Sequence, residues 1–91
     1  MKKIDFTKLE VQVSFDGTKK VFNVAKTVGN GMMYNGSVLL DIGFEDLARA
    51  IYYSDGEVEI PPQYVPAIIE IVKESAFIAT IKRTLIIMLN G

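Results

Sequence analysis

A strand pattern around Asp16-Gly17 constrains the fold more than any other feature of this 91-residue chain. Apolar and polar residues alternate before this dipeptide, and the apolar positions are Leu9, Val11, Val13 and Phe15. A period of two places such residues on one face of a β-strand. Asp-Gly favours a tight turn that reverses the chain between two strands. The sequence therefore predicts an antiparallel hairpin over residues 9–24.

The length of the turn decides which residues of the two strands face each other. A two-residue loop pairs Val11 with Phe22, and a four-residue loop pairs Val13 with Phe22, so both keep one face apolar. A three-residue loop would place Phe22 opposite polar Gln12, and register normally follows the buried face. We therefore expect two or four residues at the tip. An isolated hairpin is marginally stable, so this one must pack against other elements.

The segment 44–53 is predicted to be a helix, because its apolar residues fall on one stripe and two acidic residues lie in its first turn. Asp41 or Gly43 is the expected cap at its start. Gly56 is expected to take the left-handed conformation at the helix exit. The alternating segment 57–60 precedes two prolines, which is typical of a short edge strand.

Two more helices are predicted in the last third of the chain. One begins close to Pro66, because proline is tolerated in a first turn, and it ends at Ser75. The other runs from Ala76 towards the C-terminus, with apolar residues at three- and four-residue steps. The expected fold is α+β, a single domain over residues 1–91 in which the hairpin, with room for a short third strand, packs against about three helices.

The segment 27–36, TVGNGMMYNG, contains three glycines. Their spacing nearly matches the G-x-G-x-x-G fingerprint of dinucleotide-binding proteins. Tyr34 occupies the position where that fingerprint requires glycine, and no strand leads directly into a helix here. We predict a bend in which glycine supplies positive φ, with Tyr34 and at least one methionine packed under the hairpin as core. Whether the loop between Gly29 and Gly36 binds a ligand stays open.

The composition removes many catalytic chemistries. The chain has no cysteine and no histidine, so a thiolate nucleophile, a zinc–cysteine site and the commonest general base are excluded. We expect a protein that is not an enzyme and has no cofactor. The first ten residues do not form an export signal, and residues 64–89 carry five charges, each costing about 2.5–3.5 kcal/mol near a membrane centre. A cytoplasmic protein without a membrane span is expected.

The C-terminal helix is the candidate contact surface, because residues 85–89 are apolar all round a helical turn. The predicted interface residues are Phe77, Ile81, Leu85, Ile86 and Met88. This pattern favours a module that binds itself, as a homodimer, or another protein.

Two alternatives assign other functions. Lys19 and Lys20 on the hairpin, with Tyr34, could contact phosphate and base of a nucleic acid, although 10 basic and 11 acidic residues give no broad positive field. The second alternative is an enzyme in which carboxylates such as Asp41 and Glu45 hold a metal. Helix capping explains these two residues, so this alternative is the less favoured one.

Four segments give the chain a resemblance to a group of known proteins. Their order resembles that of small phage- and prophage-encoded proteins of similar length. The segments are KIDFTKLEVQVSFDG, VGNGMMYN, DIGFEDLARAIYYSDGEVEIP and AIIEIVKES. The resemblance spans most of the chain and contains no chemical motif. It implies a cytoplasmic accessory or assembly protein of phage origin, and it transfers no activity and no site residues.

Overall fold

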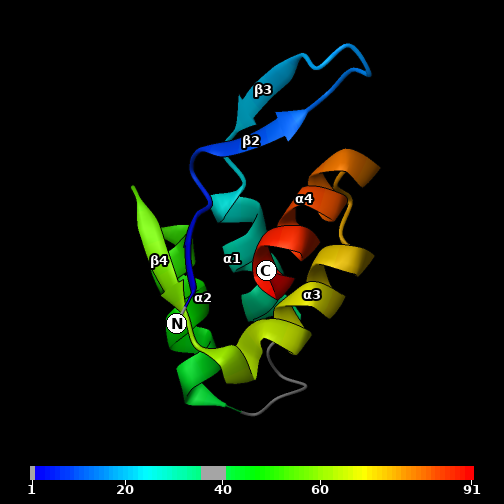
Figure 1. Ribbon diagram of the computed structural model, residues 1–91. Coiled ribbons are helices and arrows are strands. Elements are labelled where there is room, and N and C mark those ends of the chain that lie inside the picture. The colour runs from blue at the N-terminus through cyan, green and yellow to red at the C-terminus, as the bar shows by residue number, and fades with distance from the viewer. Residues whose placement is uncertain (1, 36–40) are drawn as a thin grey trace.

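Four α-helices, a short 3-10 helix and two antiparallel sheets make up the part of the chain that the computed structural model describes, residues 2–35 and 41–91 (Figure 1). The elements are β1 (Lys2–Asp5), β2 (Leu9–Gln12), β3 (Lys19–Phe22), α1 (Ala25–Asn35), α2 (Ile42–Tyr52), β4 (Glu57–Ile60), η2 (Pro62–Tyr64), α3 (Val65–Glu74) and α4 (Ala79–Asn90). The predicted α+β class is confirmed, with one α-helix more than expected.

The predicted hairpin is β2 and β3, but its register differs from both expected registers. Leu9 lies opposite Phe22, where Val11 or Val13 was predicted. The shift is an even number of residues, so it leaves every side chain on its predicted face. Leu9 and Val11 are accordingly buried.

The register follows from where the chain turns. Val13 N–H donates to the carbonyl of Thr18, so four residues, from Ser14 to Gly17, form the tip. Gly17 N–H donates to the carbonyl of Ser14 at 3.2 Å, and Gly17 has φ of 95°. The carboxylate of Asp16 accepts a hydrogen bond from Thr18 N–H at 2.9 Å. The tip thus has four residues, one of the two predicted lengths. Asp-Gly ends this loop, whereas the expected registers made it the whole of a two-residue loop or the start of a four-residue one.

The short strand predicted at 57–60 is confirmed as β4, but its partner is β1. These strands are antiparallel, with Ile4 opposite Val58. No strand was predicted at the N-terminus, although Ile4 and Phe6 are both buried and alternate with polar residues. The two strands are far apart in the sequence, with the hairpin and two helices between them. No turn in the sequence therefore indicates that they pair.

The bend predicted at 27–36 is wrong, because residues 25–35 form helix α1. Just before this helix, the Asn23 side chain accepts a hydrogen bond from Ala25 N–H at 3.2 Å, so one N–H group of the first turn has a partner. Val28 and Met32, spaced by one helical turn, are buried. This apolar stripe is the helical signal that the glycine content of the segment obscured.

Gly29 serves the contact between α1 and α2 and has no positive φ. A Cβ atom added to it would lie 2.8 Å from Tyr52 Cβ and 2.9 Å from the carbonyl oxygen of Ala48. Only glycine therefore permits this close approach of the two helix backbones. Gly36 lies outside the described residues.

Helix α2 confirms the predicted helix and its cap. Asp41 is the N-cap, since its carboxylate accepts from Gly43 N–H at 2.8 Å. The prediction that Gly56 takes the left-handed conformation is wrong. Of the described glycines, only Gly17 at the hairpin tip has positive φ. The helix instead ends through Tyr53, whose N–H donates to the carbonyls of Arg49 and Ile51.

The two C-terminal helices are found where predicted, with one later start. α3 contains Pro66 in its first turn and ends before Ser75, as expected. α4 begins at Ala79 rather than Ala76, because Ser75 and Ile78 have extended backbone angles. Residues 75–78 therefore connect the two helices.

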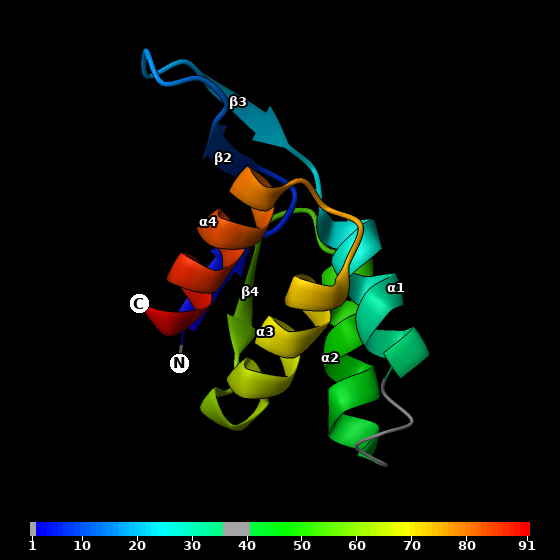
Figure 2. The same cartoon turned by 90° about the vertical axis from the view of Figure 1, so that its right-hand side faces the viewer.

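One apolar cluster lies between the helices and the two sheets, and no polar or charged side chain of the described residues is buried in it. Its largest fully buried side chains include Phe6, Phe44, Ile51, Ile68 and Leu85. The β1–β4 sheet runs beside the helices, and the hairpin β2–β3 stands beyond one end of them (Figure 2). The molecule is elongated, 43 × 24 × 21 Å.

Candidate protein-interaction surface

The distal half of the hairpin leaves apolar side chains in solvent. Phe15, at the tip, is fully exposed, and Val13, where the strands meet the tip, is 36% exposed. The base of the same hairpin is covered, because Leu9 and Val11 pack into the core. The hairpin is therefore an arm that is anchored at one end and unsupported at the other.

A groove of about 520 Å³ lies between this arm and α4, and we call it the hairpin groove. It is lined by Gln12, Val13, Ser14, Phe15, Thr80, Arg83, Thr84 and Ile87. The four α4 residues are spaced by three or four positions, so they form one face of the helix. The groove therefore has a strand end and a loop on one side and a helix face on the other.

The opposite face of α4 explains why this face is free. Ile81, Leu85 and Leu89 repeat every four residues and are buried in the core. The groove face instead carries Ile87, which is 63% exposed. Thr84 donates its hydroxyl hydrogen to the carbonyl of Thr80 at 2.9 Å, so this polar group already has a partner. The groove face thus offers an uncovered apolar side chain beside a threonine hydroxyl that already has a partner.

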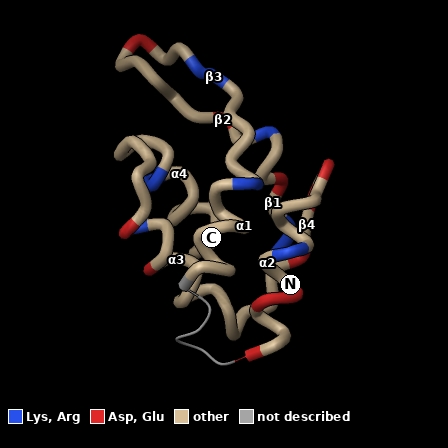
Figure 3. The backbone as a smooth tube through the Cα atoms, turned by 180° about the vertical axis from the view of Figure 1, so that it is seen from behind, with Lys and Arg blue, Asp and Glu red and all other residues tan. Residues whose placement is uncertain are grey.

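An acidic position lies at the hairpin tip, with basic positions along β3 and in α4 (Figure 3). α4 carries Lys82 and Arg83 and no acidic residue. Lys82 donates to the carbonyl of Lys73, whereas Arg83 makes no hydrogen bond or ion pair with any residue that the structure describes. At the tip, hydrogen bonds from the Thr18 hydroxyl and N–H lower the pKa of Asp16 below its ordinary value, so this carboxylate is charged at neutral pH.

The predicted interface residues of the C-terminal helix divide into two groups. Ile81 and Leu85 are buried within the chain, so they have no surface to offer a partner. Phe77, Ile86 and Met88 are half-buried against the core. Interface formation by this helix stays a prediction. Its exposed apolar residue, Ile87, was not among the five, because a segment that is apolar all round does not indicate which side the core covers.

The structure does not bring the predicted nucleic-acid residues together. Lys19 forms an ion pair with Glu10 at 3.5 Å, and Lys20 is exposed on β3. Tyr34 is 88% exposed near the end of α1, where it lines a hollow with the α3–α4 connection. The expectation that Tyr34 is a core residue under the hairpin is wrong, because it lies on the solvent side of a helix.

The candidate carboxylates serve local structure. Asp41 accepts hydrogen bonds from Gly43 N–H and from the Tyr64 hydroxyl, each at 2.8 Å, and the second bond raises the pKa of Tyr64. Glu45 forms an ion pair with Arg49 at 2.8 Å. Within residues 2–35 and 41–91, no three acidic residues are grouped so that they could hold a metal ion.

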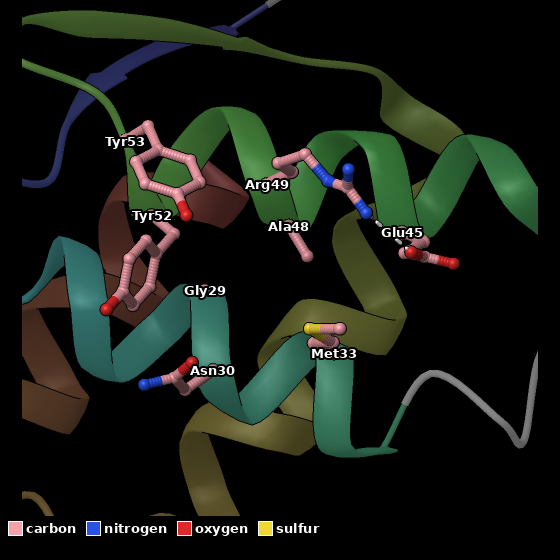
Figure 4. Close-up of a pocket in the computed structure, with 8 residues that line it drawn as sticks. All are labelled: Gly29, Asn30, Met33, Glu45, Ala48, Arg49, Tyr52 and Tyr53. Carbon is pink, nitrogen blue, oxygen red and sulfur yellow. Dashed lines mark hydrogen bonds and ion pairs between the residues drawn. The ribbon is translucent and has the colours of Figure 1, made fainter.

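A second hollow, of about 430 Å³, lies where α1 crosses α2 (Figure 4). Tyr52 and Tyr53 meet edge to face with ring centroids 4.8 Å apart, and Tyr53 faces solvent, since it is 77% exposed. The Lys26 ammonium lies 5.7 Å from the Tyr52 ring centroid. Arg49, which also lines this hollow, already pairs with Glu45. The charged groups here therefore have partners within the chain.

Comparisons with known proteins do not assign the chain to a family or a function. No protein-family model, no curated protein and no solved structure matches this chain. Among the described residues, no helix has both the length and the apolar character needed to cross a membrane.

Proposed function

We propose that this protein is a non-enzymatic interaction module that associates with itself through the hairpin groove. The observation that carries the proposal is the fully exposed Phe15 at the end of an arm that overhangs the exposed Ile87 of α4. Contiguous apolar surface rimmed by polar residues is typical of interaction sites. Aromatic residues and arginine are also enriched in protein interfaces, and this surface contains Phe15 and Arg83.

The stability of the arm supports the same function. A two-stranded hairpin is marginally stable in water and gains stability when an apolar face is covered. Here the base of the hairpin is covered by the core, whereas Val13 and Phe15 in the distal half are exposed. Association would cover this half. The resemblance to phage-encoded proteins extends the proposal to an accessory or assembly role in the cytoplasm of an infected cell.

Sedimentation equilibrium of the full chain over a range of concentrations tests the proposal. The monomer mass is 10.1 kDa, and we expect the weight-average mass to rise towards twice this value. Ile87→Asp should abolish the rise, because it places a charge in the groove. Tyr53→Ser is the matched control, since it removes an exposed aromatic ring outside the groove and should leave association unchanged. A chain that stays monomeric at every concentration would refute self-association.

A further inference from the structure

The hairpin tip carries side chains that complement the hairpin groove. We propose that two copies exchange their tips, so that Phe15 of each copy enters the groove of the other against Ile87, and Asp16 of each pairs with Arg83 of the other. This inference rests on the proposed self-association and names the occupant of the groove. The occupant is a second copy of this chain, in a two-fold symmetric pair.

Charge and shape favour this occupant. The groove contains an arginine without a partner among the described residues and an apolar wall. The tip presents a fully exposed aromatic ring directly followed by a carboxylate. An aromatic ring fills an apolar groove, and a carboxylate forms charge-assisted hydrogen bonds with a guanidinium. Both features therefore occur on one chain, as a self-complementary interface requires.

The tip does not fill its own groove. Phe15 borders the groove of its own chain but remains fully exposed. The loop is held by the hydrogen bond from Gly17 N–H to Ser14 and by two from Thr18 to Asp16. These local bonds fix the shape of the loop that presents Phe15, and entry into a second copy leaves them intact. Two-fold exchange also closes the assembly, since each tip occupies one groove.

Four variants of the full chain, studied by sedimentation equilibrium, test the exchange. Phe15→Ala should weaken dimerisation by about 100-fold or more, because two buried phenylalanine side chains are lost per dimer. Arg83→Glu should weaken it as well, because it places two carboxylates together. Tyr34→Ala is the control for Phe15→Ala, since it removes an exposed aromatic ring outside the groove. Lys8→Glu is the control for Arg83→Glu, since it reverses an exposed positive charge outside the groove. Both control variants should dimerise like the original chain.

A mixing experiment distinguishes tip-to-groove contact from contact between the two tips. A chain with Phe15→Ala keeps the α4 side of its groove, and a chain with Ile87→Asp keeps its tip. We expect their mixture to dimerise more strongly than either variant alone, because one intact contact forms in the mixed pair. If the original chain dimerises but Phe15→Ala and Arg83→Glu dimerise equally well, the exchange is refuted while self-association stands. Polymers that grow with concentration would also refute a closed exchange, and a strict monomer would refute both proposals.

Discussion

Replacing Gly29 by alanine should destabilise the protein, because this residue lies where α1 and α2 are closest. The new Cβ would lie 2.8 Å from Tyr52 Cβ and 2.9 Å from the Ala48 carbonyl oxygen. Carbon atoms in favourable contact are about 3.5 Å or more apart, so the helices must separate by roughly 0.7 Å. Such overpacking costs about 1–3 kcal/mol. The gain in helix propensity from glycine to alanine, about 1 kcal/mol, offsets part of this cost.

Gly31→Ala is the matched control, two residues further along the same helix. Among the described residues, its added Cβ would approach one atom, Cγ2 of the Ile71 side chain at 3.2 Å, and would meet no backbone of another helix. Both variants gain the same helix propensity, so the difference between them isolates the clash at Gly29.

Thermal unfolding followed by circular dichroism measures that difference. We expect the Gly29→Ala variant to be less stable than Gly31→Ala by about 1–3 kcal/mol. For a domain of this size the difference lowers Tm by at least about 4 °C. Equal Tm values for the two variants would refute the close contact between α1 and α2, and with it our explanation of this glycine.

Three further predictions concern the core, a helix cap and pH. Leu85→Ala should lower the free energy of unfolding by about 2–5 kcal/mol, because Leu85 is fully buried. Ile87→Ala should change it by less than about 0.5 kcal/mol, because Ile87 is exposed. Equal losses for the two variants in denaturant titrations would contradict this orientation of α4. Asp41→Ala should cost about 1 kcal/mol in the same assay, since it removes the cap of α2, and an unchanged denaturation midpoint would argue against that cap. Hydrogen bonds from Thr7 lower the pKa of Asp5, so their stabilising effect is present above about pH 4 and is lost as the pH falls through the lower folded pKa. Asp5→Asn should therefore lose less stability than the original chain on acidification below about pH 4, and identical acid unfolding curves would exclude this contribution.

Local periodicity was sufficient to predict the elements whose contacts are close in sequence. The hairpin, the helices over 42–52 and 65–74, and the strand over 57–60 were all indicated by alternating or helical spacing. Their partners were harder to predict, because pairing between β1 and β4 joins residues more than fifty positions apart. The register of the hairpin depended on the position of its loop, which several hydrogen bonds of Ser14 and Asp16 determine.

The errors on α1 and on the contact surface have a common cause, which is tertiary context. Gly29 suggests a bend when the sequence is considered alone, but packing against α2 requires a residue without a side chain there. In the same way, Leu85 and Ile87 are equally apolar in the sequence, and only the position of α4 against the core decides that Leu85 is buried and Ile87 exposed. Arg83 is exposed, and its place beside the hairpin tip depends on how the arm lies over α4.

The most direct test of self-association through the hairpin groove is an isotope-filtered NOE experiment on a mixture of labelled and unlabelled chains. Such a spectrum detects only contacts between different copies. We predict cross-peaks between the ring protons of Phe15 in one copy and the methyl groups of Ile87 in the other. A dimer whose spectrum lacks these cross-peaks, with the Phe15 ring contacting its own hairpin alone, would contradict the assignment of this surface.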